Sequence, residues 1–198
     1  MIKTIEDLYI QYKAYQDIMG KIRRTVDKNE LFPIIRGLYE TEKKTPGHYL
    51  AAYIYGPSYL SFEYALYHYH LIPENVYTYT SATVNKQKSK KYQTLFGTFT
   101  YQDVPVSAYP LSVIAKEENG YVYFIATKEK ALCDTLYKMK PVGSIKQLKM
   151  ALFEDLRINE DEFKQLDVNL ILNLTRRYKS TNLSLLETYV KEVLSCKS

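Results

Sequence analysis

The spacing of apolar residues near the N-terminus predicts two short helices. Apolar positions recur at helical spacing in residues 4–12, and Glu6 and Asp7 fall in the first turn, where the helix dipole favours acidic side chains. In residues 15–28 an apolar stripe lies opposite a side rich in lysine and arginine. The second helix is therefore expected to be amphipathic, with a basic outer face.

A short β-hairpin is expected directly after the basic helix. Two apolar runs meet at Arg36-Gly37, where glycine permits the positive φ of a tight turn. Helix, basic helix and hairpin in this order outline a winged helix-turn-helix. The polar stretch 41–47, broken by proline and glycine, is the expected boundary between a DNA-binding head of residues 1–44 and a body of residues 45–198.

The body pattern mixes strand and helix signals. Ser61 is expected to cap a helix, and the lysine-rich segment 85–91 is expected to be the loop of a β-hairpin. Strands are predicted over residues 77–83, 96–101 and 121–126, and helices over residues 49–54, 62–69, 128–139, 144–156, 160–166, 169–178 and 183–194. The sequence thus predicts an α+β fold: a winged head, a body with a short, mostly antiparallel sheet, and a helical C-terminal part.

Composition narrows the class of protein. With 198 residues and 46% hydrophobic content the chain can bury a core, and 21 tyrosines without tryptophan make that core partly polar. No apolar run is long enough to span a bilayer and the start lacks a signal-peptide layout, so we expect a cytoplasmic protein without a membrane partner. Cys133 and Cys196 fit neither a disulfide framework nor a zinc site and are interpreted as free thiols.

Basic residues supply the candidate nucleic-acid contacts. The net charge of +5 favours polyanions only weakly, so position matters more than the total. The candidate DNA-binding residues are Lys21, Arg23, Arg24 and Lys28 on the basic helix and Arg36 at the hairpin tip. The alternative interpretation is a solvated helix face and a polar turn. Lys86, Lys88, Lys90 and Lys91 either keep a hairpin soluble or contact nucleic acid or an acidic partner.

The chain shows no pattern typical of a catalytic, metal or cofactor site. His68 and His70 do not share a helix face, and they are interpreted as packing and surface residues. Asp103, Lys116, Glu117 and Glu118 loosely resemble a nuclease set, although their spacing is poor. Glu129, Lys130 and Asp134 are interpreted as helix-start and surface residues. We therefore expect no catalytic residues, no metal and no cofactor.

Three segments together resemble the AbiEi family of antitoxins from type IV toxin–antitoxin systems. They are GKIRR (residues 20–24) with RGLY (36–39), YGPSYLS (55–61) with LIPE (71–74) and VYTYTS (76–81), and IATKEKALCD (125–134). The chain differs from the family at His70, where glycine is common, and in having one short helix before the basic one.

This resemblance implies an antitoxin acting in phage defence by abortive infection. Such a protein represses its own promoter and counters a nucleotidyltransferase-like toxin, without needing a stable toxin complex. Two alternatives remain open from the residues: a stand-alone transcription regulator that uses the same head, and a nuclease-like enzyme that uses the acidic residues from Asp103 to Glu118.

Overall fold

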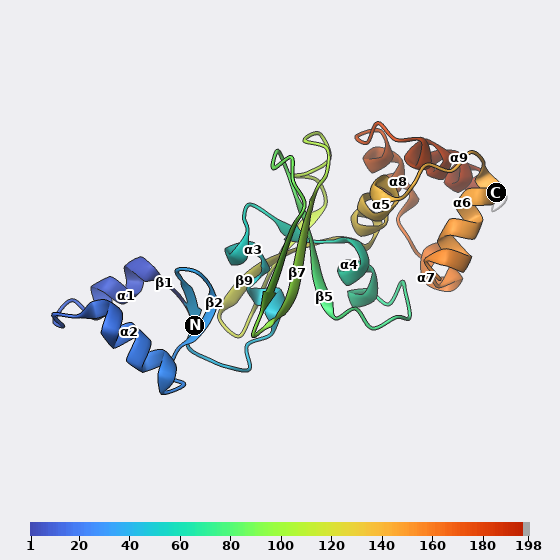
Figure 1. The fold of residues 1–198 in the computed structure, drawn as a ribbon. Coiled ribbons are helices and arrows are strands. Elements are labelled where there is room, and N and C mark those ends of the chain that lie inside the picture. Colours follow the sequence, from blue (N-terminus) through green and yellow to red (C-terminus); the bar gives the residue numbers. More distant parts are fainter. Residues whose placement is uncertain (196–198) are drawn as a thin grey trace.

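The computed structural model describes residues 1–195, and within them the strands form two sheets, one of three strands and one of six. The head lies at one end of an elongated molecule, the larger sheet lies in the middle, and the C-terminal helices lie at the other end (Figure 1). The predicted α+β class and the helical C-terminal part are confirmed.

The head follows the predicted order, with one additional strand in front. Its elements are β1 (Ile2–Thr4), α1 (Ile5–Gln11), α2 (Ile18–Asp27), β2 (Phe32–Ile35) and β3 (Leu38–Glu40). The Thr4 side chain accepts a hydrogen bond from the Asp7 backbone, and the Asp7 carboxylate accepts one from the Thr4 backbone, so a capping box starts α1. All strand pairs of the small sheet are antiparallel, in the order β1-β3-β2.

Apolar residues of the head pack in two directions. Leu8, Ile22 and Leu31 form a small core between the helices and the sheet. Phe32, Ile34 and Leu38 instead belong to the large buried cluster that runs through the body. The head is therefore joined to the body by shared apolar packing, and the boundary at residue 44/45 stays a prediction.

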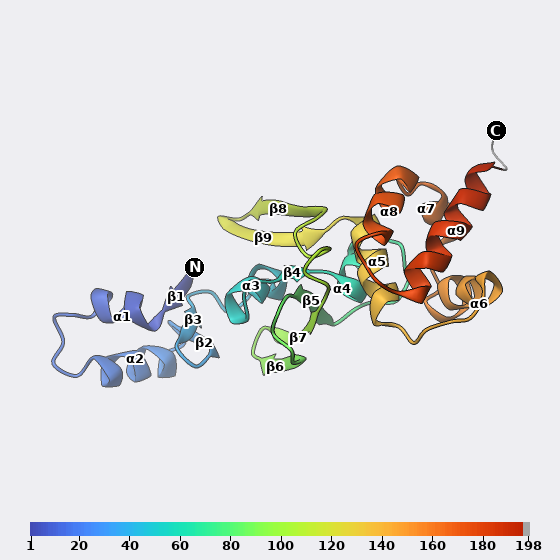
Figure 2. The ribbon, with the colours of Figure 1, turned by 90° about the horizontal axis from the view of Figure 1, so that it is seen from above.

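The larger sheet has the order β6-β7-β5-β4-β9-β8. Its strands are β4 (Tyr59–Leu60), β5 (Thr78–Thr83), β6 (Lys90–Thr94), β7 (Gly97–Asp103), β8 (Val113–Glu118) and β9 (Tyr121–Ala126). Figure 2 shows β4 between the β8–β9 hairpin and the strands β5–β7. Among the described strands, three of the five neighbouring pairs are antiparallel, and β5–β7 and β4–β9 are parallel.

The predicted hairpin of residues 77–83 with residues 96–101 is wrong in its pairing. β5 and β7 are neighbours but run parallel, with Thr78 opposite Thr98 and Thr83 opposite Asp103. Parallel neighbours need a crossover rather than a tight loop, and the chain makes it through β6, which adds to the outer side of β7. Lys90 and Lys91 therefore belong to an edge strand and not to a loop.

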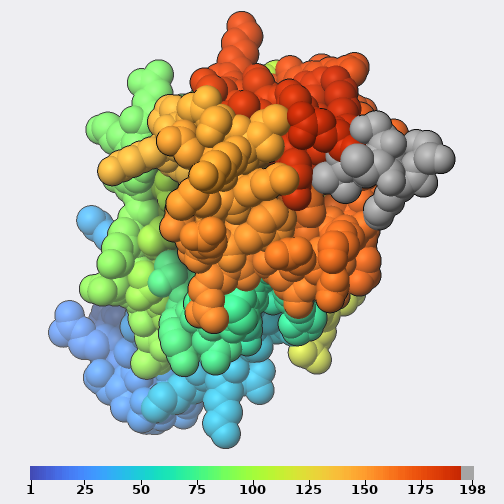
Figure 3. All heavy atoms as spheres, turned by 90° about the vertical axis from the view of Figure 1, so that its right-hand side faces the viewer, coloured from blue at the N-terminus to red at the C-terminus, as the bar shows by residue number. Residues whose placement is uncertain are grey.

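Helices cover the sheet and form the C-terminal part. They are η1 (Gly47–Tyr49), α3 (Ala51–Ile54), α4 (Phe62–His68), α5 (Lys128–Lys138), α6 (Ile145–Met150), the π-helix η2 (Ala151–Asp155), α7 (Glu160–Lys164), α8 (Val168–Thr175) and α9 (Thr181–Ser195). Figure 3 views the molecule from this end and shows the C-terminal helices (orange and red) over much of that face. None of the helices in the described chain is long and apolar enough to cross a membrane.

Two details at the ends of α4 differ from the simple expectation. Ser61 occupies the N-cap position but makes no capping hydrogen bond, and the Tyr64 amide donates instead to Thr80 Oγ1 at 3.0 Å. At the other end His70 adopts φ 59°, and the Leu71 amide donates to the Leu66 carbonyl, which closes the helix as a glycine would. The Ser61 hydroxyl is thereby free for a different partner.

Candidate nucleic-acid interface

Helix α2 turns one side to the core of the head and the other to solvent. Ile22 and Thr25 are buried, whereas Met19, Arg23 and Lys28 are exposed. Asp17 caps the helix by accepting a hydrogen bond from the Gly20 amide at 2.8 Å. A side chain on Gly20 would meet that carboxylate at 1.8 Å, so glycine leaves room for the cap.

The four basic residues predicted on α2 differ in their surroundings. Arg23, Arg24 and Lys28 are exposed, as the amphipathic pattern predicts. Lys21 is half-buried, and its Nζ lies 5.5 Å and 5.1 Å from the ring centres of two tyrosines of the inter-helix turn, Tyr12 and Tyr15. Lys21 therefore holds the turn by cation–π contacts. Arg24 lies 3.9 Å from the Asp17 carboxylate, and Arg23 and Lys28 have no ion-pair partner among the described residues.

Arg36 lies where the sequence places it, exposed at the tip of the β2–β3 hairpin. Gly37 adopts φ 81°, as the turn requires, and its carbonyl accepts a hydrogen bond from the Ile5 amide at 2.8 Å. The tip is thus fixed to the first residue of α1 and does not extend as a long, mobile wing.

The lysine-rich segment lies in the body, at the edge of the larger sheet. Lys88, Lys90 and Lys91 are exposed. Lys86 is half-buried, donates from Nζ to the Gly56 carbonyl at 2.9 Å, and lies over the Tyr55 ring. Three lysines on or beside an edge strand fit the predicted role of keeping that edge unpaired.

The acidic residues of the nuclease alternative are not brought together. Asp103 accepts hydrogen bonds from the Thr83 hydroxyl and from the Lys86 and Gln87 amides at 2.6–2.7 Å. Desolvation opposes them, but together these bonds lower the pKa of Asp103 below its usual value. Glu117 and Glu118 lie on β8, and three strands separate β8 from the β7 strand of Asp103. Four inter-strand spacings amount to roughly 19 Å, too far for one metal-binding or catalytic group.

Lys116 and Glu118 join a different cluster, with aromatic residues. Tyr123 and Tyr49 donate to the Glu118 carboxylate at 2.7 Å and 3.2 Å, and these bonds lower its pKa. His48 Nε2 lies 3.8 Å from the same carboxylate. Lys116 Nζ lies 3.0 Å from Nε2 of His68. The cluster fastens η1 and α4 to the β8–β9 hairpin.

Both histidines of this cluster are packed against aromatic rings. The Tyr64 ring stacks between them, with centroid distances of 6.3 Å to His48 and 6.5 Å to His68. Burial is the main cause that lowers the pKa of each histidine. His70 is exposed. The interpretation of His68 and His70 as packing and surface residues is confirmed.

The interpretation of Glu129, Lys130 and Asp134 as surface residues is wrong. All three are buried, and Lys130 and Asp134 have no exposed area. Glu129 Oε1 accepts a hydrogen bond from the Asp167 amide at 3.1 Å, which ties α5 to the start of α8. Thr127 caps α5 as predicted. Helix α5 is therefore a central helix, enclosed on all sides, and not a surface helix.

Asp134 is the centre of a buried polar cluster. Its Oδ1 lies 2.8 Å from Lys130 Nζ and accepts a hydrogen bond from the Tyr178 hydroxyl at 2.5 Å. Its Oδ2 accepts from the Ser61 hydroxyl at 2.7 Å and from the Tyr59 hydroxyl at 3.0 Å. Lys130 also donates to Tyr178. The cluster joins the end of β4, helix α5 and the segment after α8.

Two of the three segments that carry the family resemblance meet at this cluster. Tyr59 and Ser61 come from YLS, and Lys130 and Asp134 come from KEKALCD. Cys133 lies in the same helix, is buried and free, and burial raises the pKa of its thiol. Cys196 lies outside the described residues.

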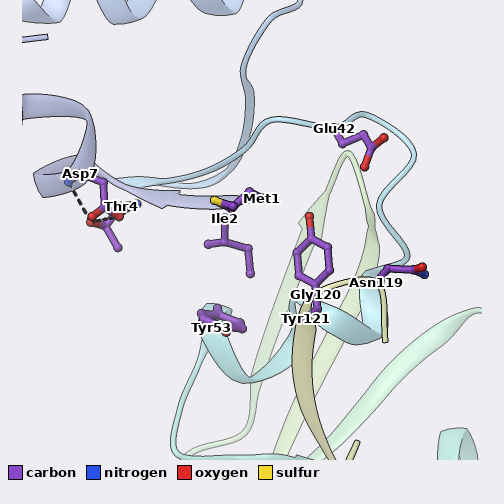
Figure 4. Close-up of a pocket in the computed structure, with 9 residues that line it drawn as sticks. All are labelled: Met1, Ile2, Thr4, Asp7, Glu42, Tyr53, Asn119, Gly120 and Tyr121. Atoms are coloured by element: carbon purple, nitrogen blue, oxygen red, sulfur yellow. Dashed lines mark hydrogen bonds between the residues drawn. The ribbon is translucent and has the colours of Figure 1, made fainter. Parts of the chain in front are cut away.

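A cleft of about 360 Å³ lies between head and body (Figure 4). It is lined by Met1, Ile2, Thr4, Asp7 and Glu42 of the head and by Tyr53, Asn119, Gly120 and Tyr121 of the body.

Within the described chain, no three His, Cys, Asp or Glu side chains are grouped to hold a metal ion.

The sequence matches no protein-family model. No curated protein matches it at a significant level either.

Proposed function

We propose that the protein is a DNA-binding transcription regulator and the antitoxin of a type IV toxin–antitoxin pair. The main observation in support is the order of elements in the head. A strand, a short helix and a capped amphipathic helix with an exposed basic side are followed by a hairpin that pairs with the first strand. This is the order of a winged helix-turn-helix with one helix fewer. In such a domain the second helix enters the major groove.

The electrostatics of α2 support this assignment. Arg23 and Lys28 have no acidic side chain within 4.0 Å in the described chain, and Arg24 has only the exposed Asp17 at 3.9 Å. When unpaired surface cations of a protein contact DNA phosphates, the counterions condensed on the DNA are released. This release supplies most of the non-specific affinity for DNA. Arg36, at the hairpin tip, adds a cation suited to the flanking backbone.

The antitoxin part of the proposal rests on the family resemblance. Two segments of that resemblance, 55–61 and 125–134, contact each other in this chain through the hydrogen bonds of Tyr59 and Ser61 to Asp134. The proposed partners are promoter DNA and a nucleotidyltransferase-like toxin.

DNA binding is tested by titrating the protein against its own upstream region at several salt concentrations. Arg24→Ala should weaken binding to all sequences and reduce the slope of log K against log salt by about one unit. Arg157→Ala, which removes an exposed arginine of the body, is the matched control and should change neither quantity. Equal affinity and slope for wild type and Arg24→Ala would remove α2 from the interface.

The antitoxin role is tested separately, by co-expression with a neighbouring nucleotidyltransferase-like gene. The full-length protein should restore growth and repress a reporter fused to its promoter. Repression without protection would refute the antitoxin role and leave the regulator role standing.

A further inference from the structure

The exposed side of α2 carries two different kinds of side chain. The cations Arg24 and Lys28 lie exposed on one flank of the helix. Beside them Met19, Arg23 and Asp27 follow one another at intervals of four residues, and all three are exposed. Positions i, i+4 and i+8 lie along one line of an α-helix. Along this line the apolar Met19 is followed by the hydrogen-bond donor Arg23 and then by the acceptor Asp27.

This line does not have the chemistry of a phosphate-binding surface. Asp27 would repel a phosphate, and Met19, 54% exposed, has no polar atom to offer one. The edges of base pairs in the major groove present the complementary set: the thymine methyl, the guanine acceptors O6 and N7, and the cytosine amino group. The flanking cations, by contrast, suit the sugar–phosphate backbone.

We infer that Met19, Arg23 and Asp27 determine sequence specificity by contacting base edges in the major groove of duplex DNA. Arg23 donates to a guanine, Met19 packs against a thymine methyl, and Asp27 accepts from a cytosine. This inference rests on the proposed function and assigns the specificity of the same helix.

The helix geometry sets the spacing of the recognised bases. Four residues of α-helix rise about 6 Å, which corresponds to roughly two base-pair steps along the groove. The site should therefore contain a thymine and a cytosine, each within about two steps of the guanine and on opposite sides of it.

The test begins with selection of binding sequences from a random duplex DNA library by the full-length protein. Wild type should enrich the guanine with its neighbouring thymine and cytosine. Arg23→Ala should lose roughly 5- to 150-fold of the preference for guanine. Arg24→Ala, the matched control on the same helix, should keep the preference and instead reduce the slope of log K against log salt by about one unit.

Met19 and Asp27 have tests of their own. Replacing the thymine by uracil removes only the methyl group and should weaken wild type about 4-fold, while leaving Met19→Ala unaffected. Asp27→Ala removes both the negative charge and the acceptor, so it should bind all sequences more tightly and lose the preference for cytosine. Because these side chains are exposed, the thermal unfolding of each variant should match wild type.

These experiments distinguish base recognition by Met19, Arg23 and Asp27 from DNA binding as such. No binding to any duplex would overturn both. Binding without sequence enrichment, or enrichment that depends on Arg24 and not on Arg23, would overturn the inference and leave the regulator role intact. Equal binding to duplex RNA, whose major groove is too narrow for a helix, would also overturn it.

Discussion

Removing the Asp134 carboxylate should cost a large part of the stability of the protein. In Asp134→Ala the Lys130 ammonium stays fully buried without its counter-charge, and the hydroxyls of Tyr59, Ser61 and Tyr178 lose their acceptor. Breaking a buried ion pair from one side typically costs about 3–5 kcal/mol. Since a domain is stable by about 5–15 kcal/mol, the variant should still fold at 25 °C but unfold much earlier in denaturant.

Urea unfolding followed by far-UV circular dichroism measures this loss. For a chain of this size an m-value near 3 kcal/mol per molar converts the loss into a midpoint lower by about 1–2 M. The matched control is Asp161→Ala, since Asp161 also pairs with a lysine on its own helix, Lys164 at 3.0 Å, but on the surface. An exposed pair contributes below about 1 kcal/mol, so its midpoint should scarcely move.

A second variant separates the ion pair from the hydroxyl network. Lys130→Met with Asp134→Leu removes both charges and keeps apolar volume, so it should be less destabilised than Asp134→Ala alone. If Asp134→Ala lies within 1 kcal/mol of Asp161→Ala, the cluster does not hold the body together as argued. If the double variant is the worse of the two, the hydroxyl hydrogen bonds outweigh the ion pair.

Three further predictions follow from burial and backbone geometry. Burial lowers the pKa of His48 and His68 below the unfolded value of 6.5, so the unfolded chain binds more protons below that pH. Their contribution to stability is therefore complete above pH 6.5 and falls as the pH drops toward the native pKa. The urea midpoint should be lower at pH 5.5 than at pH 7.5, and the double variant His48→Gln with His68→Gln should reduce this difference. His70→Gly should raise the free energy of unfolding by about 0.5–1 kcal/mol, because φ 59° strains histidine but not glycine, and a lower value would contradict this. Cys133 should resist thiol reagents until urea unfolds the chain, as peptide mapping would show, because its thiol is enclosed and its pKa is raised; rapid native labelling would refute its enclosure.

Signals carried by neighbouring residues were sufficient to predict much of the head. Glu6 and Asp7 in the first turn predict the start of α1, and Arg36-Gly37 predicts the hairpin turn, because both signals depend on a few adjacent positions. The exposed side of α2 follows from its period of 3.6 residues. Strand β1 escaped prediction because three residues carry no recognisable alternation, and it forms only by pairing with β3.

Pairing between distant strands could not be predicted in the same way. The parallel pairing of β5 with β7 depends on the path of the chain between them, through β6. The residues of the two strands favour β-structure equally in a parallel and in an antiparallel pair. Lys90 and Lys91 hid β6 because lysine has low β-propensity, although it is common on edge strands.

The polar cluster escaped prediction for a related reason. Lys130 and Asp134 have the i, i+4 spacing of a surface ion pair, and such pairs are usually exposed. The available signal was Ala131, Leu132 and Cys133 between them, since apolar residues on every side of a helix indicate that it is buried. Partners as remote as Tyr59 and Tyr178 give no such signal in the sequence.

The span of the Asp134 cluster along the chain has a consequence for synthesis. Its members extend from Tyr59 to Tyr178 along the chain. The buried Lys130–Asp134 pair therefore has all its hydrogen-bond partners only after the ribosome has passed residue 178. The small core of the head, by contrast, lies within residues 5–39. A nascent chain can therefore assemble the head core first, while an interrupted chain keeps an unfinished body. Unfinished bodies expose apolar surface and are substrates for proteolysis, so the cluster makes durable molecules depend on translation reaching Tyr178.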